Sequence, residues 1–237
     1  QVRYAASLFI RTAKTLGIPI IIVGHVTKEG MVAGPMVLSH MVDTVLFFEG
    51  DKTTTMRILK SLKNRFGPVE EVGVFMMQDK GIEEVKDPRH LFLTERAKDV
   101  SGSVITIALE GTRALPVEIQ ALAIFSKLPL PRRVSSGIDP KRLELLIAVL
   151  QKHCGAPLGT MDVFVNVAGG LKLSDPGVDL AVCLAIFSSF KNIALSNTVC
   201  VAEVGLLGEL RSVVSLDKRI KEAQKMGFAD IISVKNY

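Results

Sequence analysis

The feature that most constrains the fold is a largely polar stretch, residues 79–102, which contains Pro88 and ends in Ser101-Gly102. On either side of it, apolar residues recur at the spacing of helices and strands. A polar stretch with turn-forming residues between two patterned segments is typical of a domain boundary. We therefore expect two domains in the 237 residues, covering 1–98 and 103–237.

The first segment has the pattern of an α/β domain. Apolar residues at helical spacing run from Val2 to Leu16, and Gly17 follows as a C-cap glycine would. The β-branched run 18–23 then predicts a buried parallel strand. Residues 24–35 are predicted as a loop at the carboxyl end of that strand, where open α/β sheets bind ligands. A short helix at 36–41 and probable antiparallel strands at 44–48, 54–61 and 71–77 are expected to follow.

The second segment has a mixed α/β pattern. Strands are predicted at 103–109, 113–125, 162–167, 198–204 and 231–234. Asp139-Pro140 and Asp175-Pro176 each place an N-cap residue and an N1 proline before a helical pattern, and a third helix is expected before Gly227. About 135 residues of mixed strands and helices are enough for a self-sufficient domain.

Composition limits the function classes only weakly. The net charge of +5 indicates a polyanionic partner, whereas the absence of Trp and the two Tyr argue against aromatic stacking as the main means of binding single strands. The three cysteines lack the spacing of a metal site and suit a reducing compartment. No apolar run reaches the roughly 18 residues that span a membrane. Because the chain starts with Gln1 in a helical pattern, we expect it to be part of a longer protein.

Two clusters carry candidate chemistry in the first segment. In residues 24–30, His25 follows the predicted strand and could sense a phosphate, and Lys28 could contact a nucleic-acid backbone. The alternative is an ordinary loop. At the end of another predicted strand, Lys63 and Arg65 stand two residues apart, on one face of an extended segment. Such a pair can neutralise charge on a nucleotide's terminal phosphate. The alternative is a basic turn exposed to solvent.

These clusters carry a resemblance to a known family. The segments GHVTKEG, AGPMVLSHMVDTVLFFEGD and above all KNRFG resemble the bacterial RadA (Sms) family of DNA-repair proteins, and the likeness extends over essentially the whole chain. It implies that residues 1–98 are the C-terminal half of a RecA-like ATPase core. It further implies that His25 couples nucleotide state to a DNA-binding loop, and that Lys63 and Arg65 act near a nucleotide bound by a neighbouring subunit.

The resemblance also implies cofactors and partners. A full-length member carries ATP, Mg²⁺ and an upstream zinc module; no G-x-x-x-x-G-K-[ST] is present in this chain, so we expect it alone not to hydrolyse ATP. The expected partners are single-stranded and duplex DNA, a RecA-type recombinase and further copies in a hexameric ring that drives branch migration. No membrane partner is expected. The expected location is the cytoplasm of a bacterium, or an organelle if the source is a plant.

Residues 103–237 resemble the proteolytic domain of Lon proteases through Gly169-Gly170, residues 175–178 and residues 204–210. Val178, or at best Asp179, stands where the family has its serine nucleophile, and Asp217 stands where it has its lysine base. Neither can perform that chemistry, so we expect an inactive Lon-like domain. Two alternatives stay open. One is a Ser-Lys protease with a shifted pair, Ser174 and Lys218, and the other is a non-enzymatic, ring-forming DNA-binding scaffold.

A basic patch is predicted in the second segment, formed by Arg132, Arg133, Lys141 and Arg142. The last two stand in the first turn of a predicted helix, where a cation is unfavourable and a phosphate would be stabilised. We therefore expect the patch to contact duplex DNA; the alternative is a solvated basic surface. His40, His90 and the pair His153-Cys154 have no further ligands at metal-site spacing, and no metal site is predicted.

Overall fold

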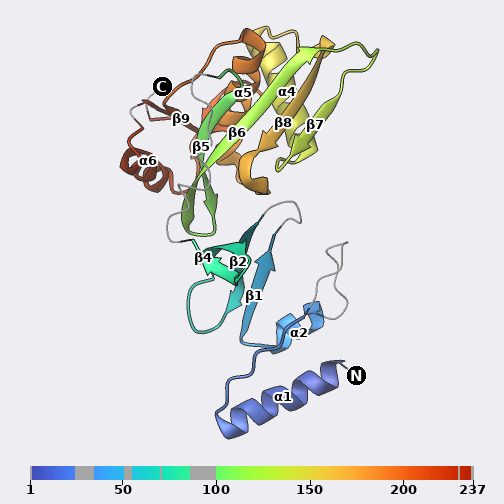
Figure 1. Ribbon diagram of the computed structural model, residues 1–237, viewed down its shortest axis with the longest axis vertical. Helices are drawn as coiled ribbons and strands as arrows, with labels where there is room; N and C mark the ends of the chain where they lie inside the picture. Colours follow the sequence, from blue (N-terminus) through green and yellow to red (C-terminus); the bar gives the residue numbers. More distant parts are fainter. Residues whose placement is uncertain are drawn as a thin grey trace.

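A computed structural model describes residues 2–24, 35–50, 55–69, 71–85, 100–228 and 230–235. The chain has a mixed α/β fold, as predicted, with one sheet in each half (Figure 1). We call the described residues up to 85 the first region and residues 100–235 the second region. In Figure 1 the sheet of the first region lies between the N-terminal helices and the larger sheet of the second region.

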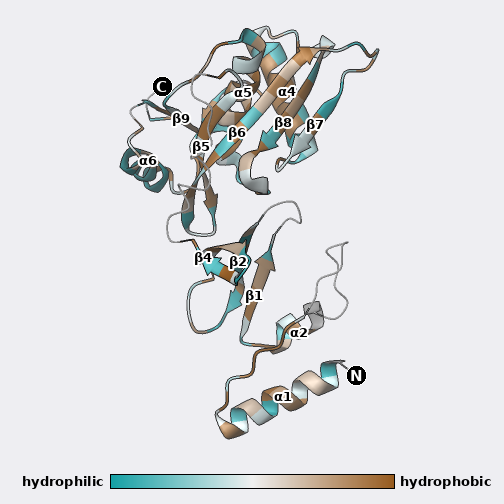
Figure 2. Cartoon of the chain, viewed as in Figure 1, coloured by the Kyte–Doolittle hydropathy of each residue, from teal (hydrophilic) through white to brown (hydrophobic). Residues whose placement is uncertain are grey.

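The first region begins with α1 (Val2–Leu16), which ends at Gly17 in the left-handed conformation. The prediction of a buried strand at 18–23 is wrong for this chain. These residues are not paired with any described strand, and Ile21 and Val23 are 89% and 83% exposed. Figure 2 shows the run as an apolar trace between α1 and α2 (Pro35–Met41). A strand is fixed by its neighbours as well as by its own residues, and no described residues supply them.

Four antiparallel strands form the first sheet, in chain order: β1 (Thr44–Glu49), β2 (Met56–Asn64), β3 (Val72–Gln78) and β4 (Gly81–Glu84). The three antiparallel strands predicted here are confirmed, whereas β4 lies inside the polar stretch and was not predicted. The pairing of β1 with β2 contains a register shift, since Val45 pairs with Lys63 and Leu46 with Ser61. Leu62 is therefore an extra residue in β2, as in a β-bulge.

The second region is built on a six-stranded sheet in the order β12-β9-β5-β6-β8-β7. Its strands are β5 (Ser103–Glu110), β6 (Arg113–Phe125), β7 (Arg133–Ser136), β8 (Met161–Val167), β9 (Thr198–Val201) and β12 (Asp230–Ser233). A separate hairpin joins β10 (Glu203–Val204) to β11 (Leu210–Arg211). The short strands β7, parallel to β8, and β11 were not predicted, and the predicted strand at 198–204 is divided into β9 and β10.

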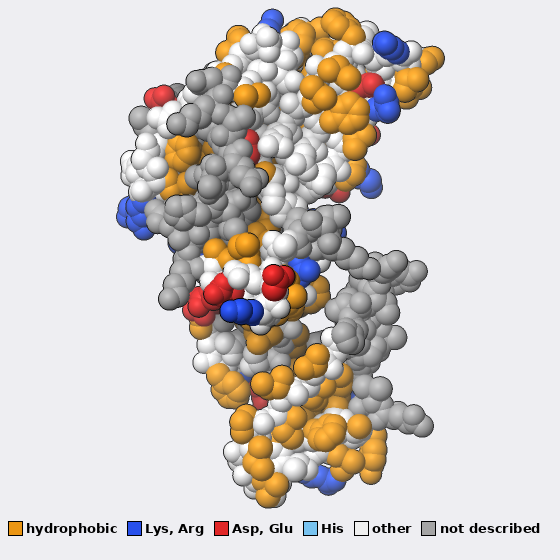
Figure 3. Space-filling model, in the orientation of Figure 1, with side chains coloured by type: hydrophobic (Ala, Val, Ile, Leu, Met, Phe, Trp, Pro, Cys, Tyr) orange, Lys and Arg blue, Asp and Glu red, His pale blue; other side chains and the backbone are white. Residues whose placement is uncertain are grey.

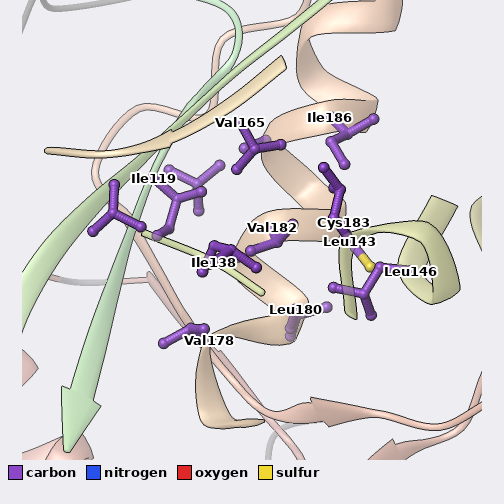
Figure 4. Packing of buried hydrophobic residues seen from close by; sticks show 14 of the residues in the cluster. Ile119, Ile138, Leu143, Leu146, Val165, Val178, Leu180, Val182, Cys183 and Ile186 are labelled. Atoms are coloured by element: carbon purple, nitrogen blue, oxygen red, sulfur yellow. The ribbon is translucent and has the colours of Figure 1, made fainter. Parts of the chain in front are cut away.

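Two helices cover one face of this sheet. The helix α4 (Pro140–Cys154) begins as predicted, because the Asp139 side chain accepts a hydrogen bond from the Arg142 N–H. At Asp175-Pro176 the chain first makes one 3₁₀ turn, η3 (Pro176–Val178), and then α5 (Asp179–Lys191). Figure 4 shows side chains of α4 and α5 meeting residues of the sheet in a fully buried core.

The third helix, α6 (Leu216–Lys225), lies on the opposite face. Alternate residues of β5 show this, because Val104 and Ala108 belong to the core under α4 and α5, whereas Ile105 and Ile107 pack with Leu216 in a second cluster. The second region thus has a core on both faces of its sheet.

The two regions touch through the first sheet. Ile58 of β2 and Val74 of β3 are buried in the same apolar cluster as the core of the second region. Beside them the Lys60 Nζ lies 2.7 Å from a carboxylate oxygen of Glu110 in β5 and 3.2 Å from one of Glu49 in β1. A strand of the first region is therefore anchored to the second by packing and by a shared ion pair.

Candidate functional site

Lys63, the last residue but one of β2, is bound to the end of a helix. Its Nζ donates to the carbonyl oxygens of Ser39 and Val42, both at 2.7 Å, and lies 3.4 Å from that of His40. These carbonyls belong to the last turn of α2 and to the residue that follows it, the end of a helix where side chains commonly supply hydrogen-bond donors. An ammonium group at this end of a helix is favoured by the helix dipole. Lys63 therefore caps α2.

Arg65 is held by the same junction between α2 and β1. Its Nη1 lies 3.2 Å from the Asp43 Oδ1, and its backbone N–H donates to the Asp43 carbonyl at 3.1 Å. Between the two cations, the Asn64 Oδ1 accepts from the Phe66 N–H at 3.1 Å, which closes the turn. The structure thus brings Lys63 and Arg65 together against residues 39–43, where both contact the protein itself.

The other predicted site of the first region, His25 and Lys28, lies outside the described residues. Its position in the chain still bears on the geometry, because the segment 25–34 leads directly into α2. The helix that Lys63 caps is therefore the element that follows the predicted nucleotide-sensing and DNA-contacting loop. The sequence pattern did not indicate this contact, since the acceptors are backbone carbonyls.

Four basic residues were predicted to contact DNA in the second region. Two of them, Arg132 and Arg133, contact β8 or the residues just before it. The Arg132 N–H donates to the Asp162 Oδ1 at 2.7 Å, and its guanidinium lies 5.9 Å from the centre of the Phe164 ring. The Arg133 guanidinium donates to the carbonyls of Met161 and, at 2.7 Å, of Leu158. Arg132 stays exposed, whereas the guanidinium of Arg133 joins the β7 strand to the segment before β8.

Arg142 makes a bidentate ion pair with Asp179 at the start of α5, with an Nε–Oδ1 distance of 3.1 Å. Burial raises the pKa of Asp179, and the hydrogen bonds from Arg142 and from the Val204 N–H oppose that rise. The cation in the first turn of α4 is thus neutralised within the protein, which removes the conflict that suggested a phosphate at Arg142. Lys141, beside it, is exposed.

A second buried pair lies in the part that resembles a protease. Arg219 is 1% exposed, and its guanidinium binds both carboxylate oxygens of Asp175, one of them at 2.9 Å. The same carboxylate accepts from the backbone N–H groups of Leu109 and Gly177. Three separate segments meet at Asp175 in this way, and the sequence pattern gave no sign of this pair.

The residues expected at the protease positions have other surroundings. Val178 is buried in the core, and Ser174 is exposed. The Lys218 ammonium donates to the Thr112 carbonyl, and Asp217 pairs with Lys235, which lowers the pKa of Asp217. The carboxylate at the possible nucleophile position, Asp179, is occupied by Arg142. This arrangement holds charge pairs where a serine nucleophile and a free lysine base would be needed.

The histidines and cysteines have individual partners. The His153 Nε2 lies 3.1 Å from the Leu206 carbonyl oxygen, Cys154 is exposed, and His90 lies outside the described residues. Burial raises the pKa of both Cys183 and Cys200 to about 12. Within the part of the chain that the structure describes, no three His, Cys, Asp or Glu gather as a metal site would require, and no helix is long and apolar enough to cross a membrane.

The amino-acid sequence was compared with those of known proteins. No family model matches the chain. The chain is 49% identical over 233 residues to DNA repair protein RadA of Bacillus subtilis and 51% identical over 229 residues to that of Pseudomonas aeruginosa. It is 48% identical over 233 residues to that of Helicobacter pylori strain J99. These alignments cover 96% to 98% of the chain but only 51% to 52% of each relative, so the chain spans about half their length.

Proposed function

The chain belongs to the RadA family of DNA repair proteins, and on that premise we propose that it serves recombinational DNA repair as part of an ATP-driven, ring-forming DNA motor. The motor would act on single-stranded DNA, promote branch migration and work with a RecA-type recombinase. The relatives named above are bacterial, which supports the bacterial cytoplasm over a plant organelle as the location.

The observation that carries this proposal is the double anchoring of the turn at 63–67. Lys63 caps α2, the element that follows the expected DNA loop, and Arg65 pairs with Asp43 between α2 and β1. An anion that drew Lys63 away would remove a charged donor from the last carbonyls of α2. The proposed coupling between nucleotide state and DNA contact therefore has a physical route through α2, with His25 and Lys28 on the segment before it.

ATP binding is proposed for the longer protein. The phosphate loop, Mg²⁺ and the zinc module would come from the half of the relatives' length that this chain does not span. The exposed apolar run 18–23 supports the proposal that part of the ATPase core lies outside this chain. Both of its faces are apolar and exposed, as in a central strand that lacks its neighbours. We propose that residues 1–98 complete a RecA-like core together with that remaining half.

For the second region we propose a Lon-like scaffold that contacts duplex DNA. The two buried Arg–Asp pairs support a structural role over a proteolytic one. Of the predicted contacts we retain Lys141, since Arg132, Arg133 and Arg142 are engaged by the protein. The proposal of a ring-forming scaffold without enzymatic activity remains the second candidate for this chain alone.

A chimera tests the motor proposal. The matching half of the Bacillus subtilis relative is replaced by this chain, and survival of DNA damage and DNA-stimulated ATP turnover are measured. We expect Lys63→Ala with Arg65→Ala to abolish both, since a cation that stabilises phosphoryl transfer contributes on the order of 10³ or more in rate. Lys152→Ala, at an exposed lysine of α4, is the control. Full activity of the double variant would refute the assignment.

A further inference from the structure

Part of the second sheet has no covering layer. The helix α6 packs on β5 and β9, but on the same face Leu122 of β6 and Val134 of β7 are exposed and Phe164 of β8 is only partly buried. Leu122 pairs with Phe164, and Phe164 with Val134, so three apolar side chains form a row across three strands. Leu122 is 51% exposed and Val134 is nearly as open. A row of this kind on a sheet face is normally buried by another layer.

The loop after β6 extends this open surface. Its exposed apolar side chains are Phe125, Leu128 and Leu130. Figure 3 shows hydrophobic side chains gathered over this end of the region, with Lys or Arg side chains beside them. Lys127 is an exposed cation of the same segment, and the exposed Arg132 has its guanidinium 3.4 Å from a carboxylate oxygen of Asp162. We call the row and this loop the sheet patch. It is an apolar surface with basic side chains, of the kind that marks an interaction site.

A second exposed apolar surface lies at the tip of the hairpin between β10 and β11. Leu206 and Leu207 stand there, and Leu207 is 81% exposed. Glu203 and Glu209 flank the tip in the sequence, and Arg211 pairs with Glu209. The tip is held to α4, because the Leu206 carbonyl meets His153 and Gly208 lies against the His153 ring. This hairpin tip is therefore on the helix-covered side of the sheet, opposite the sheet patch.

We propose that the sheet patch of one copy binds the hairpin tip of a second copy of this chain. The two surfaces include seven of the twelve large apolar residues that are exposed among the described residues of the second region. One is a broad strand face beside the exposed Lys127, and the other is a protruding pair of leucines beside Glu203 and the Glu209–Arg211 pair. Apolar contact and charge are thus complementary within a single sequence.

The positions of the two surfaces decide the type of contact. A surface that meets itself gives a closed pair of copies, whereas two different surfaces on opposite sides give a head-to-tail contact that forms rings or filaments. This contact rests on the proposed function in one respect, because the proposed motor is a ring of several copies. It assigns the ring contact in the second region to named residues, and it makes no use of DNA or ATP.

Site-directed cross-linking tests the contact in the full chain. In a Cys154→Ser background, where the remaining thiols are buried, Val134→Cys and Leu207→Cys are introduced in separate preparations. The two preparations are mixed and treated with a short bis-maleimide. We expect the mixture to give several-fold more cross-linked dimer than either preparation alone. Adding Lys127→Glu to the Val134→Cys variant is expected to lower that yield, because it places like charges opposite each other. Ile193→Cys, exposed outside both surfaces, replaces Val134→Cys in the control mixture.

Each outcome decides the proposal. Efficient cross-linking of Val134→Cys with itself would show that the sheet patch meets its own copy and would overturn the head-to-tail contact. A mixed yield no higher than that of the Ile193→Cys control would overturn the contact altogether. Binding of a labelled single-stranded oligonucleotide is measured on the same uncross-linked variants. Absence of that binding in the Cys154→Ser parent as well as in the variants, with intact cross-linking, would count against the proposed function and leave the contact standing.

Discussion

The two regions of the molecule differ in where their apolar side chains lie. In the second region, residues such as Val182 and Ile186 are fully buried between the sheet and α4. In the first region, apolar residues of the run 18–23 and of the outer face of β1, including Leu46 and Phe48, are exposed. The second region therefore buries most of its apolar side chains in its own core, whereas the first region leaves apolar surfaces exposed, of the kind that marks an interaction site.

The cations show the same contrast. Lys63 and Arg65 bind backbone carbonyls and a half-exposed carboxylate at the surface. Arg219 and Arg142 instead bind carboxylates that are removed from water. Charges of the first kind can exchange one partner for another at small cost, whereas a buried pair is costly to separate.

The largest effect is expected at the buried pair Arg219–Asp175, where the contrast is sharpest. Arg219→Met would leave the Asp175 carboxylate buried without its cation and lower the free energy of unfolding by about 3–5 kcal/mol. Urea unfolding followed by circular dichroism measures this. Arg211→Met, which removes the exposed pair with Glu209, is the matched control and should change little. Equal losses of stability from the two substitutions would contradict the distinction between buried and exposed ion pairs.

Core truncation compares the two regions directly. Ile186→Ala should lower the free energy of unfolding by about 2–5 kcal/mol, because it leaves a cavity among fully buried neighbours. Ile21→Ala, at a side chain that is almost wholly in water, should leave the unfolding midpoint in urea unchanged. A marked loss of stability with Ile21→Ala would mean that the run 18–23 is already packed in solution.

The cap of α2 predicts a smaller and local effect. Lys63→Met should weaken the last turn of α2 by about 1 kcal/mol, because the carbonyls of Ser39 and Val42 lose a charged donor. Hydrogen–deuterium exchange at the α2 amides should become about fivefold faster, which is that free energy expressed as a ratio. Exchange in the core of the second region is the internal control. Unchanged exchange in α2 would exclude the cap.

The smallest effect concerns pH and Asp162. The Arg132 N–H, then the Ser126 hydroxyl and the Arg132 guanidinium hold the pKa of Asp162 below its ordinary value. Its ionised form therefore stabilises the fold above about pH 4, and this contribution is lost as the pH falls through the lowered pKa. Asp162→Asn should be less stable than the parent at pH 7, and the difference should shrink at pH 3. Urea unfolding at both values measures it, with Asp230→Asn as control. A difference that does not depend on pH would contradict this role.

Much of the fold could be predicted where the signal is local. Asp139-Pro140 marked the start of α4, and alternating residues marked β5 and β6, because capping and strand burial depend on neighbours in the sequence. The prediction of a buried strand at 18–23 was wrong because the signal there is not local. Its residues are those of a buried strand, but burial also depends on segments that lie elsewhere.

The site was less predictable than the fold. The spacing of Lys63 and Arg65 indicated two neighbouring cations, but it did not show that the acceptors of Lys63 are main-chain carbonyls, which every residue has. The pair Asp175–Arg219 joins residues 44 positions apart. No periodic pattern links such residues, so only the folded chain reveals which charges are structural. The roles of His25, Lys28 and Lys141 remain proposals.

The extra residue Leu62 in β2 has a consequence for the direction of the turn that follows it. Paired residues of neighbouring strands project to the same side, so Lys60 opposite Phe47 and Lys63 opposite Val45 share one side, although an odd step of three separates them. Deleting Leu62 would restore strict alternation and reverse the side on which Lys63 emerges, away from the end of α2. Because of this one extra residue, Lys63 near the end of β2 binds the end of α2, while Lys60 on the same side of the strand pairs with Glu110 of the second region.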